Sequence, residues 1–337
     1  MELGMVFDLR APDWGTPRRE LLAAALDIAA WADDIGFDVL GLGEHHGSDD
    51  GYNPSPLILG SAFAGRTRRI HMRTAVLLAS CYDPIRLAED TAMLQLLSNG
   101  RFELGLGFGY RQSEFAMYGR RVEDRFAHTC KVAEVLKQAW TGQFFEYEGR
   151  PCRVSPVPDT PIPLMLGGQS PAVARAAARI ADGFLIPLQN AKLWQPYRDE
   201  CLKLGKADPG EYPKQGPTFL WVSEDPERDW EWLMPHMVHI LESCAKWTAE
   251  AYGKPTGVYA HGVSAETIRA SGVYQVLTPE QTIALIGKLG DNSSLYLTPL
   301  LSGLEPKRAW KMLELWQREV HPHVPRGIIP NWCHTPR

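Results

Sequence analysis

Residues 97–110 read LSNGRFELGLGFGY, and this stretch decides the fold class. The helical pattern before it is opened by Asp83-Pro84, a capping side chain followed by a proline at the first helical position. Asn99-Gly100 ends that helix, and Phe102–Leu106 has the composition of a short strand. A helix, a turn, a strand and a glycine-rich turn, in that order, predict one unit of a parallel α/β sheet.

The same alternation extends from this stretch in both directions. Strands are expected at residues 3–9, 37–42, 70–78, 102–106, 162–166, 184–187, 218–222 and 295–297. Helices are expected between them. One begins at Thr16-Pro17, with Thr16 as the hydroxyl N-cap, and others begin at Ser170-Pro171 and at the capping box Thr278–Gln281. Residues 224–275 break the rhythm.

Eight strands that alternate with helices predict a single (β/α)8 TIM barrel over residues 1–337. The irregular segment predicts an insertion after strand 7, at about residues 224–275. A doubly wound open sheet is the alternative arrangement of the same elements.

Composition narrows the class of protein. Hydrophobic residues make up 45% of the 337 residues and charged residues 22%, as in ordinary globular proteins. A net charge of -5 argues against a nucleic-acid or anionic-membrane surface. No signal-peptide pattern and no long apolar run are evident, so we expect a cytoplasmic protein. The six cysteines form no C-x-x-C pair and are expected to be reduced thiols.

The residues that follow the predicted strands are the candidates for chemistry, because a TIM barrel carries its active site at the carboxyl ends of its strands. Glu44-His45-His46 follows strand 2, and Gly167-Gly168-Gln169-Ser170 follows strand 5. Strand 4 ends in alternating glycines, among them Gly107, and then Tyr110. Alternating glycines clear one face of a strand, which admits a flat ring or allows close strand packing.

The turn Gly167–Ser170 has two interpretations. Its glycines let the backbone approach a ligand, and the helix behind it offers N–H groups and a positive dipole end, which together suit a phosphate. The alternative is a tight strand-to-helix turn in which Ser170 only caps the helix.

The run Glu44-His45-His46 predicts acid–base chemistry. Histidine is the side chain best suited to proton transfer near neutral pH. Because neighbouring side chains point in opposite directions at a strand end, one of the two histidines is expected to face the pocket. A structural hydrogen bond is the alternative for either ring. A metal site is not indicated, since no third ligand stands at characteristic spacing.

Taken together, these segments resemble the luciferase-like flavin monooxygenase family. The matching runs are GEHH at 43–46, PIRLAED at 84–90, LSNGRFELGLGFG at 97–109, residues 114–119, PLMLGGQSP at 163–171, ADG at 181–183 and residues 295–306. The resemblance implies a TIM barrel that binds reduced FMN, reacts it with O2 and oxidises a small organic substrate.

The resemblance also implies roles for individual residues. His45 matches the family's catalytic histidine, and Ala75-Val76 matches the position of a non-prolyl cis peptide bond that supports the flavin ring. Arg125 and Ser170 match contacts to the phosphate. Phe108 departs from the pattern, because luciferase has a phosphate-binding arginine there.

Other functions remain open at this point. Relatives in the same superfamily bind a deazaflavin and transfer hydride without oxygen, and a flavin-binding protein without catalysis is a third possibility. The resemblance implies a homodimer that receives reduced FMN from a separate NAD(P)H-dependent flavin reductase. The substrate cannot be identified from the sequence.

Overall fold

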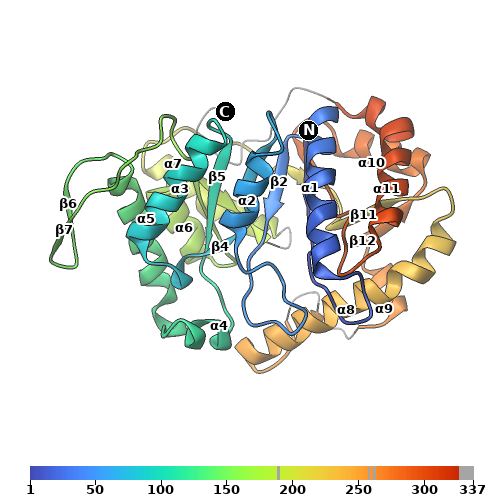
Figure 1. The fold of residues 1–337 in the computed structure, drawn as a ribbon, viewed down its shortest axis with the longest axis horizontal. Coiled ribbons are helices and arrows are strands. Elements are labelled where there is room, and N and C mark those ends of the chain that lie inside the picture. The colour runs from blue at the N-terminus through green and yellow to red at the C-terminus, as the bar shows by residue number, and fades with distance from the viewer. Residues whose placement is uncertain (188–189, 257–258, 261–262, 326–337) are drawn as a thin grey trace. The chain divides into compact units, whose positions relative to one another are not determined.

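The computed structural model describes residues 1–187, 190–256, 259–260 and 263–325, and these form two compact units (Figure 1). Unit 1 contains residues 1–40, 46–54 and the described part of 213–330. Unit 2 contains residues 41–45 and 55–212. Strand β2 (Val39–Leu42) carries the chain from unit 1 into unit 2.

Unit 1 is built from both ends of the chain. Its strands are β1 (Glu2–Val6), β10 (Lys214–Gln215), β11 (Phe219–Val222), β12 (Tyr274–Leu277) and β13 (Ser293–Leu297). Its helices are α1 (Arg18–Ile35), α8 (Pro226–Tyr252), α9 (Ala265–Ala270), α10 (Pro279–Leu289) and α11 (Pro306–Leu315), followed by a π-turn (Trp316–Val320) and a 3-10 turn (His321–His323). Strand β13 lies between β10 and β1, and β11 pairs with β12; all these pairs are parallel.

Unit 2 repeats strands and helices in sequence order. Its strands are β3 (His71–Thr74), β4 (Leu77–Leu78), β5 (Phe102–Gly107), β6 (Phe145–Tyr147), β7 (Arg150–Cys152), β8 (Leu164–Gly167) and β9 (Gly183–Leu185). Its helices are α2 (Pro56–Ala64), α3 (Pro84–Leu97), α4 (Gln112–Met117), α5 (Arg125–Ala139), α6 (Pro171–Ile180) and α7 (Trp194–Lys203), with 3-10 turns at Ala79–Cys81, Val122–Asp124 and Ala191–Leu193.

The sheet of unit 2 is parallel, in the order β3, β5, β8, β9, and β4 pairs with the end of β5. Helices α2, α3, α5, α6 and α7 each contact the next one in this series. This is the layer expected when every crossover between parallel strands has the same hand. The whole of β5 is buried, which explains its largely apolar and glycine-rich sequence, and the buried Glu103 pairs with Arg73 of β3.

The structure confirms several local predictions and corrects one. Asp83, Ser170 and Thr278 cap their helices through their side chains, and Thr278 forms the expected capping box with Gln281. The predicted cap Thr16 is wrong. Pro17 holds the cap position of α1 without a side-chain hydrogen bond, and the Thr16 N–H donates to the Gly303 carbonyl at 2.8 Å.

The strand expected at residues 70–78 is two strands, β3 and β4, and the peptide bond Ala75–Val76 between them is cis. The cis bond implied at this position is therefore confirmed. Helix α4 and the antiparallel hairpin β6–β7 had no counterpart in the sequence prediction.

A mixed α/β fold with parallel sheets is confirmed. Residues 224–275 contain α8 and α9 and lead into β12, which pairs with β11. One domain over residues 1–337, closure into an eight-stranded barrel and an insertion after strand 7 stay predictions. The five described cysteines are free thiols, as expected, and Cys333 lies outside the described residues.

Candidate active site

The candidate residues of unit 2 follow neighbouring parallel strands at their carboxyl ends. In register, Leu78 of β4 pairs with Gly107 of β5, and Gly107 pairs with Gly167 of β8. Tyr110 and Gly168–Ser170 come directly after these strand ends, and His45 follows β2. This edge of a parallel sheet is where α/β proteins place their ligands.

His45 is held by a buried carboxylate. Its Nδ1 lies 2.8 Å from Oε1 of Glu114 on α4, and the Glu114 side chain is only 1% exposed. Nη1 of Arg111 lies 3.2 Å from the same oxygen. The Tyr110 ring meets the His45 ring edge-on at 5.9 Å. An ionised carboxylate can only accept a hydrogen bond, so the hydrogen of this bond is on Nδ1 of His45. Nε2 is the other nitrogen of the imidazole ring.

Glu114 was not among the residues singled out from the sequence. Its only signal was its place at the start of the matching run 114–119. It lies on a six-residue helix, too short for a helical periodicity to be recognised. The pairing with His45 joins residues 69 positions apart, and nothing local in the sequence indicates it.

Glu44 bonds to the segment that follows Val76. Its Oε2 accepts the Leu78 N–H at 2.6 Å, and its Oε1 accepts the Tyr82 hydroxyl at 2.8 Å. Burial and then the Glu44 charge raise the pKa of Tyr82. Burial, with Glu44 and Glu114 nearby, also raises the pKa of Cys81 to about 12, so a thiolate nucleophile at Cys81 is not supported.

Val76 occupies the space that two glycines leave open. A Cβ on Gly107 would lie 2.2 Å from Cγ2 of Val76, and a Cβ on Gly167 would lie 2.5 Å from its Cγ1. A Cβ on Gly105 would lie 2.2 Å from the Thr74 carbonyl oxygen. The glycines of β5 and β8 therefore serve close packing around the bend between β3 and β4.

The turn after β8 is tightly bonded. Oγ of Ser170 accepts the Val173 N–H at 3.3 Å, and the Gly168 N–H donates to the Leu185 carbonyl at 3.2 Å. Gln169 is exposed, and α6 begins at Pro171. Ser170 therefore caps α6 through its side chain, and a phosphate at this turn stays a prediction.

Arg125 begins α5, which contacts α6. Nη1 of Arg125 donates to the Val122 carbonyl at 2.9 Å, and the side chain is half-buried. Beside it, Phe126 stacks on Phe108 with ring centroids 5.4 Å apart. An aromatic contact thus involves Phe108, the position at which this sequence departs from the pattern expected from the resemblance.

A second histidine–carboxylate pair lies in unit 1. Nε2 of His239 on α8 is 2.8 Å from Oδ2 of Asp50, and Nε of Arg10 is 3.5 Å from the same oxygen. Burial opposes ionisation of Asp50, but hydrogen bonds from Ser48 and His239 outweigh it and hold its pKa below the usual value. Arg10 also pairs with Asp8.

Arg10 is enclosed. Its guanidinium lies 4.7 Å from the centre of the Tyr52 ring and 5.0 Å from that of the Trp247 ring, and Nη2 is 3.8 Å from Sγ of Cys244. The side chain is 3% exposed. No signal in the sequence pointed to this group.

Two further histidines of the described chain are buried or hydrogen-bonded to the backbone. His46 is 6% exposed, and His236 bonds through Nδ1 to the Ser302 carbonyl at 2.8 Å. Within the described ranges, no group of three histidine, cysteine, aspartate or glutamate side chains could hold a metal ion. Among the helices that the structure describes, none combines the length and apolarity that a membrane span requires.

Comparisons with known proteins place these observations in a family. The family model "Luciferase-like monooxygenase" matches residues 1–281. The F420-dependent glucose-6-phosphate dehydrogenase of Amycolatopsis mediterranei is 30% identical over 172 residues, 48% of this chain and 52% of that protein. The chain spans about half the length of the curated relatives it matches.

Two solved structures share the fold. Monooxygenase RslO1 from Streptomyces bottropensis is 21% identical and superposes with a TM-score of 0.76, covering 96% of this chain and 99% of that one. The oxygenating constituent of 3,6-diketocamphane monooxygenase from Pseudomonas putida, in complex with FMN, is 17% identical, with a TM-score of 0.74 and coverages of 97% and 99%. Because the family model matches most of the sequence, the chain belongs to the luciferase-like monooxygenase family.

Proposed function

We propose that this protein is an FMN-dependent monooxygenase that uses reduced FMN and O2 to oxidise a small organic substrate. The observation that carries the proposal is the pair His45–Glu114 at the carboxyl ends of parallel strands. The run Glu44-His45-His46 supports FMN over a deazaflavin, because it matches the monooxygenase branch of the family.

The residues at this edge of unit 2 fit a flavin. Tyr110 presents an aromatic surface beside His45, and the partly exposed Val76 adds an aliphatic surface at the ends of β5 and β8, which suits a flat ring system. The start of α6 presents backbone N–H groups at Gln169 and Ser170, and Arg125 adds a cation with five donors. We propose that Gly107, Gly167 and Gly168 contribute backbone surface only, since their side-chain space is filled and the Gly168 N–H is already donated.

When bound, reduced FMN supplies the electrons that activate O2. The chain's own contribution is to hold a proton at a fixed place. Glu114 keeps His45 in the tautomer protonated at Nδ1, and Arg111 donates to the same carboxylate oxygen. His45 then accepts or donates a proton at Nε2, as a general acid–base group does.

A second candidate is hydride transfer with a deazaflavin and no oxygen. It is favoured by the curated relatives named F420-dependent glucose-6-phosphate dehydrogenase. The same His45–Glu114 pair would serve that reaction, since hydride transfer also requires proton movement at the substrate. The two functions differ in cofactor and in the need for O2.

Anaerobic titration separates them. The flavin-free protein is titrated with reduced FMN and with reduced deazaflavin F420, and each complex is then mixed with oxygenated buffer. We expect tighter binding of reduced FMN, followed by oxidation at a rate that differs from that of free reduced FMN. Preferred binding of reduced F420, stable in air, would instead establish the hydride-transfer function.

The proposal includes its partners. A separate NAD(P)H-dependent flavin reductase would supply reduced FMN, and we propose a cytoplasmic location for both proteins.

We also propose a homodimer, supported by exposed apolar side chains on the contacting helices α2 and α3: Ile58 is 73% exposed and Leu97 61%. Leu97→Glu should convert the dimer to a monomer in light scattering, whereas Leu202→Glu, at an exposed leucine of α7, should not.

A further inference from the structure

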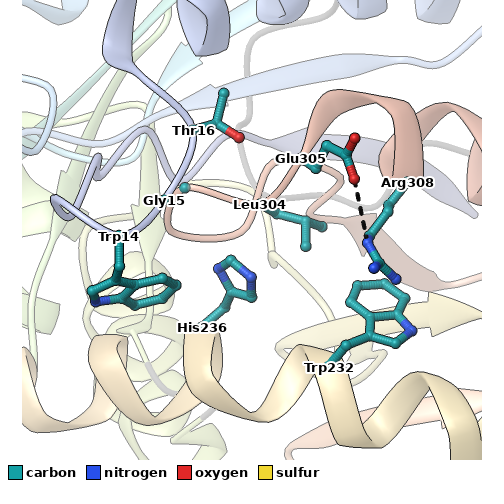
Figure 2. Close-up of a pocket in the computed structure, with 9 residues that line it drawn as sticks. Trp14, Gly15, Thr16, Trp232, His236, Leu304, Glu305 and Arg308 are labelled. Carbon is teal, nitrogen blue, oxygen red and sulfur yellow. Dashed lines mark ion pairs between the residues drawn. The ribbon is translucent and has the colours of Figure 1, made fainter.

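A cavity of about 280 Å³ lies within unit 1 (Figure 2). Three segments line it: the loop after β1, helix α8, and the loop after β13 that leads into α11. The lining residues are Trp14, Gly15, Thr16, Trp232, His236, Gly303, Leu304, Glu305 and Arg308. Strands β1 and β13 are parallel neighbours, so both loops leave the sheet at its carboxyl edge, where α/β proteins bind ligands.

The two loops form a fixed wall. The Thr16 N–H donates to the Gly303 carbonyl at 2.8 Å. Gly303 has a φ of +78°, and a Cβ there would lie 3.0 Å from Cδ of Pro12. A Cβ on Gly15 would lie 3.1 Å from Cα of Gly303. The glycines therefore permit a close approach of the loops, and the cavity is formed before any ligand arrives.

His236 offers a hydrogen-bond acceptor at this cavity. Its Nδ1 lies 2.8 Å from the Ser302 carbonyl oxygen, which can only accept, so Nδ1 carries the hydrogen. In the neutral ring Nε2 is then an acceptor. Burial lowers the pKa of His236 below 6.5, and the nearby Arg308 acts in the same direction, so the ring is neutral at pH 7.

Aromatic surfaces flank the imidazole. Trp14 is 54% exposed, and its ring centroid lies 5.0 Å from that of His236. Figure 2 shows both rings beside the loop that bears Leu304. At the other end, the Arg308 guanidinium covers the Trp232 ring at 4.5 Å and pairs with Glu305 at 3.5 Å. The Trp14 ring thus presents a flat aromatic surface next to the acceptor of His236, while Glu305 and Arg308 pair with each other at the other end.

We propose that this cavity binds a small phenol-like ligand, with its ring against Trp14 and its hydroxyl donating to Nε2 of His236. The volume is close to the lower end of small-molecule sites, roughly 300 Å³, which suits a ligand of one ring. The lining combines the aromatic rings of Trp14 and Trp232 with polar groups, among them His236. This site goes beyond the proposed flavin chemistry and does not depend on it.

The experiment compares phenol with anisole, which has the same ring and no hydroxyl hydrogen. Flavin-free protein is titrated with each by ligand-observed NMR at pH 7.5. We expect phenol to bind about 5- to 100-fold more tightly, because anisole has no hydrogen to donate to Nε2 of His236. His236→Phe should abolish the preference, and lowering the pH through the His236 pKa should weaken phenol alone.

Two further variants keep the test decisive. Trp14→Ala removes a half-exposed side chain and should weaken both ligands equally, while Phe144→Ala, at a 75% exposed ring of unit 2, should change neither. Equal affinities of phenol and anisole for the unmodified protein would overturn the proposal. So would a phenol preference that survives His236→Phe, or an absence of saturable binding.

Discussion

Each unit contains a histidine paired with a buried carboxylate at 2.8 Å: His45 with Glu114 in unit 2, and His239 with Asp50 in unit 1. In each case an arginine nitrogen also faces the carboxylate, at 3.2 Å and 3.5 Å respectively. The residue types and distances therefore do not distinguish the two pairs.

The surroundings of the two histidine–carboxylate pairs distinguish them. Arg10 of the unit 1 pair is enclosed between the Tyr52 and Trp247 rings, and the group joins α8 to the segments after β1 and β2. The unit 2 pair also follows strand ends, but it stands beside the Tyr110 ring and the glycine-rich ends of β5 and β8. A histidine–carboxylate pair is therefore a catalytic candidate only where its surroundings can bind a ligand. Elsewhere the same pair serves to connect segments of the fold.

The largest expected difference between the pairs is in turnover. His45→Ala should retain flavin binding and lose turnover by about 100- to 10,000-fold, the contribution typical of a general acid–base group. His239→Ala should leave the oxidation of bound reduced flavin nearly unchanged. Stopped-flow absorbance of the reduced complexes mixed with oxygen measures both. A defect in His239→Ala that equals the one in His45→Ala would remove the distinction.

The free energy of unfolding should depend more strongly on the group around Arg10 in unit 1 than on the pair in unit 2. Arg10→Ala leaves Asp8 and Asp50 buried without their cation, so the free energy of unfolding should fall by about 3–5 kcal/mol in urea titrations. The matched control is Arg308→Ala, whose half-exposed ion pair should contribute less than about 1 kcal/mol. Similar losses in the two variants would show that the Arg10 group is not a structural connection.

Affinity for the cofactor should depend on unit 2 alone. Arg125→Ala should weaken reduced FMN by about 1.5–3 kcal/mol, or tenfold and more, the range for hydrogen bonds to a charged group. Arg228→Ala, an exposed arginine of unit 1, serves as the control in the same fluorescence titration. Unchanged binding by Arg125→Ala would move the phosphate elsewhere.

The smallest effect concerns pH. Burial lowers the pKa of His236 in unit 1 and of His128 in unit 2 below 6.5. The unfolded chain therefore binds more protons than the folded one as the pH falls through 6.5, and stability should decline there. Replacing either histidine with Asn should reduce this loss of stability. The free energy of unfolding is measured by urea titration at several pH values between about 7.5 and 5. A slope that both variants leave unchanged would show that neither ring is held neutral.

Features set by neighbouring residues could be predicted from the sequence. The caps Asp83, Ser170 and Thr278 each act on a backbone N–H within three residues, so their spacing alone indicated them. The position of His45 at a strand end followed from the alternation of strands and helices, and Ala75–Val76 followed from family resemblance.

Features set by distant residues could not be predicted. The partner of His45 depends on where the short helix α4 lies, and the Arg10 group joins segments from three parts of the chain. Thr16 had the residue type and the following proline of a cap, but its N–H is taken by Gly303, which is 287 positions away. Tertiary contacts of this kind override local preferences.

Val76 restricts which substitutions this chain can accept during evolution. Its two methyl groups stand where side chains at Gly107 and Gly167 would have to go. A mutation at either glycine meets a methyl group within 2.5 Å, and so it is acceptable only after position 76 has become smaller. The three positions form an epistatic unit, in which the order of substitutions decides whether a new sequence at this edge can be reached.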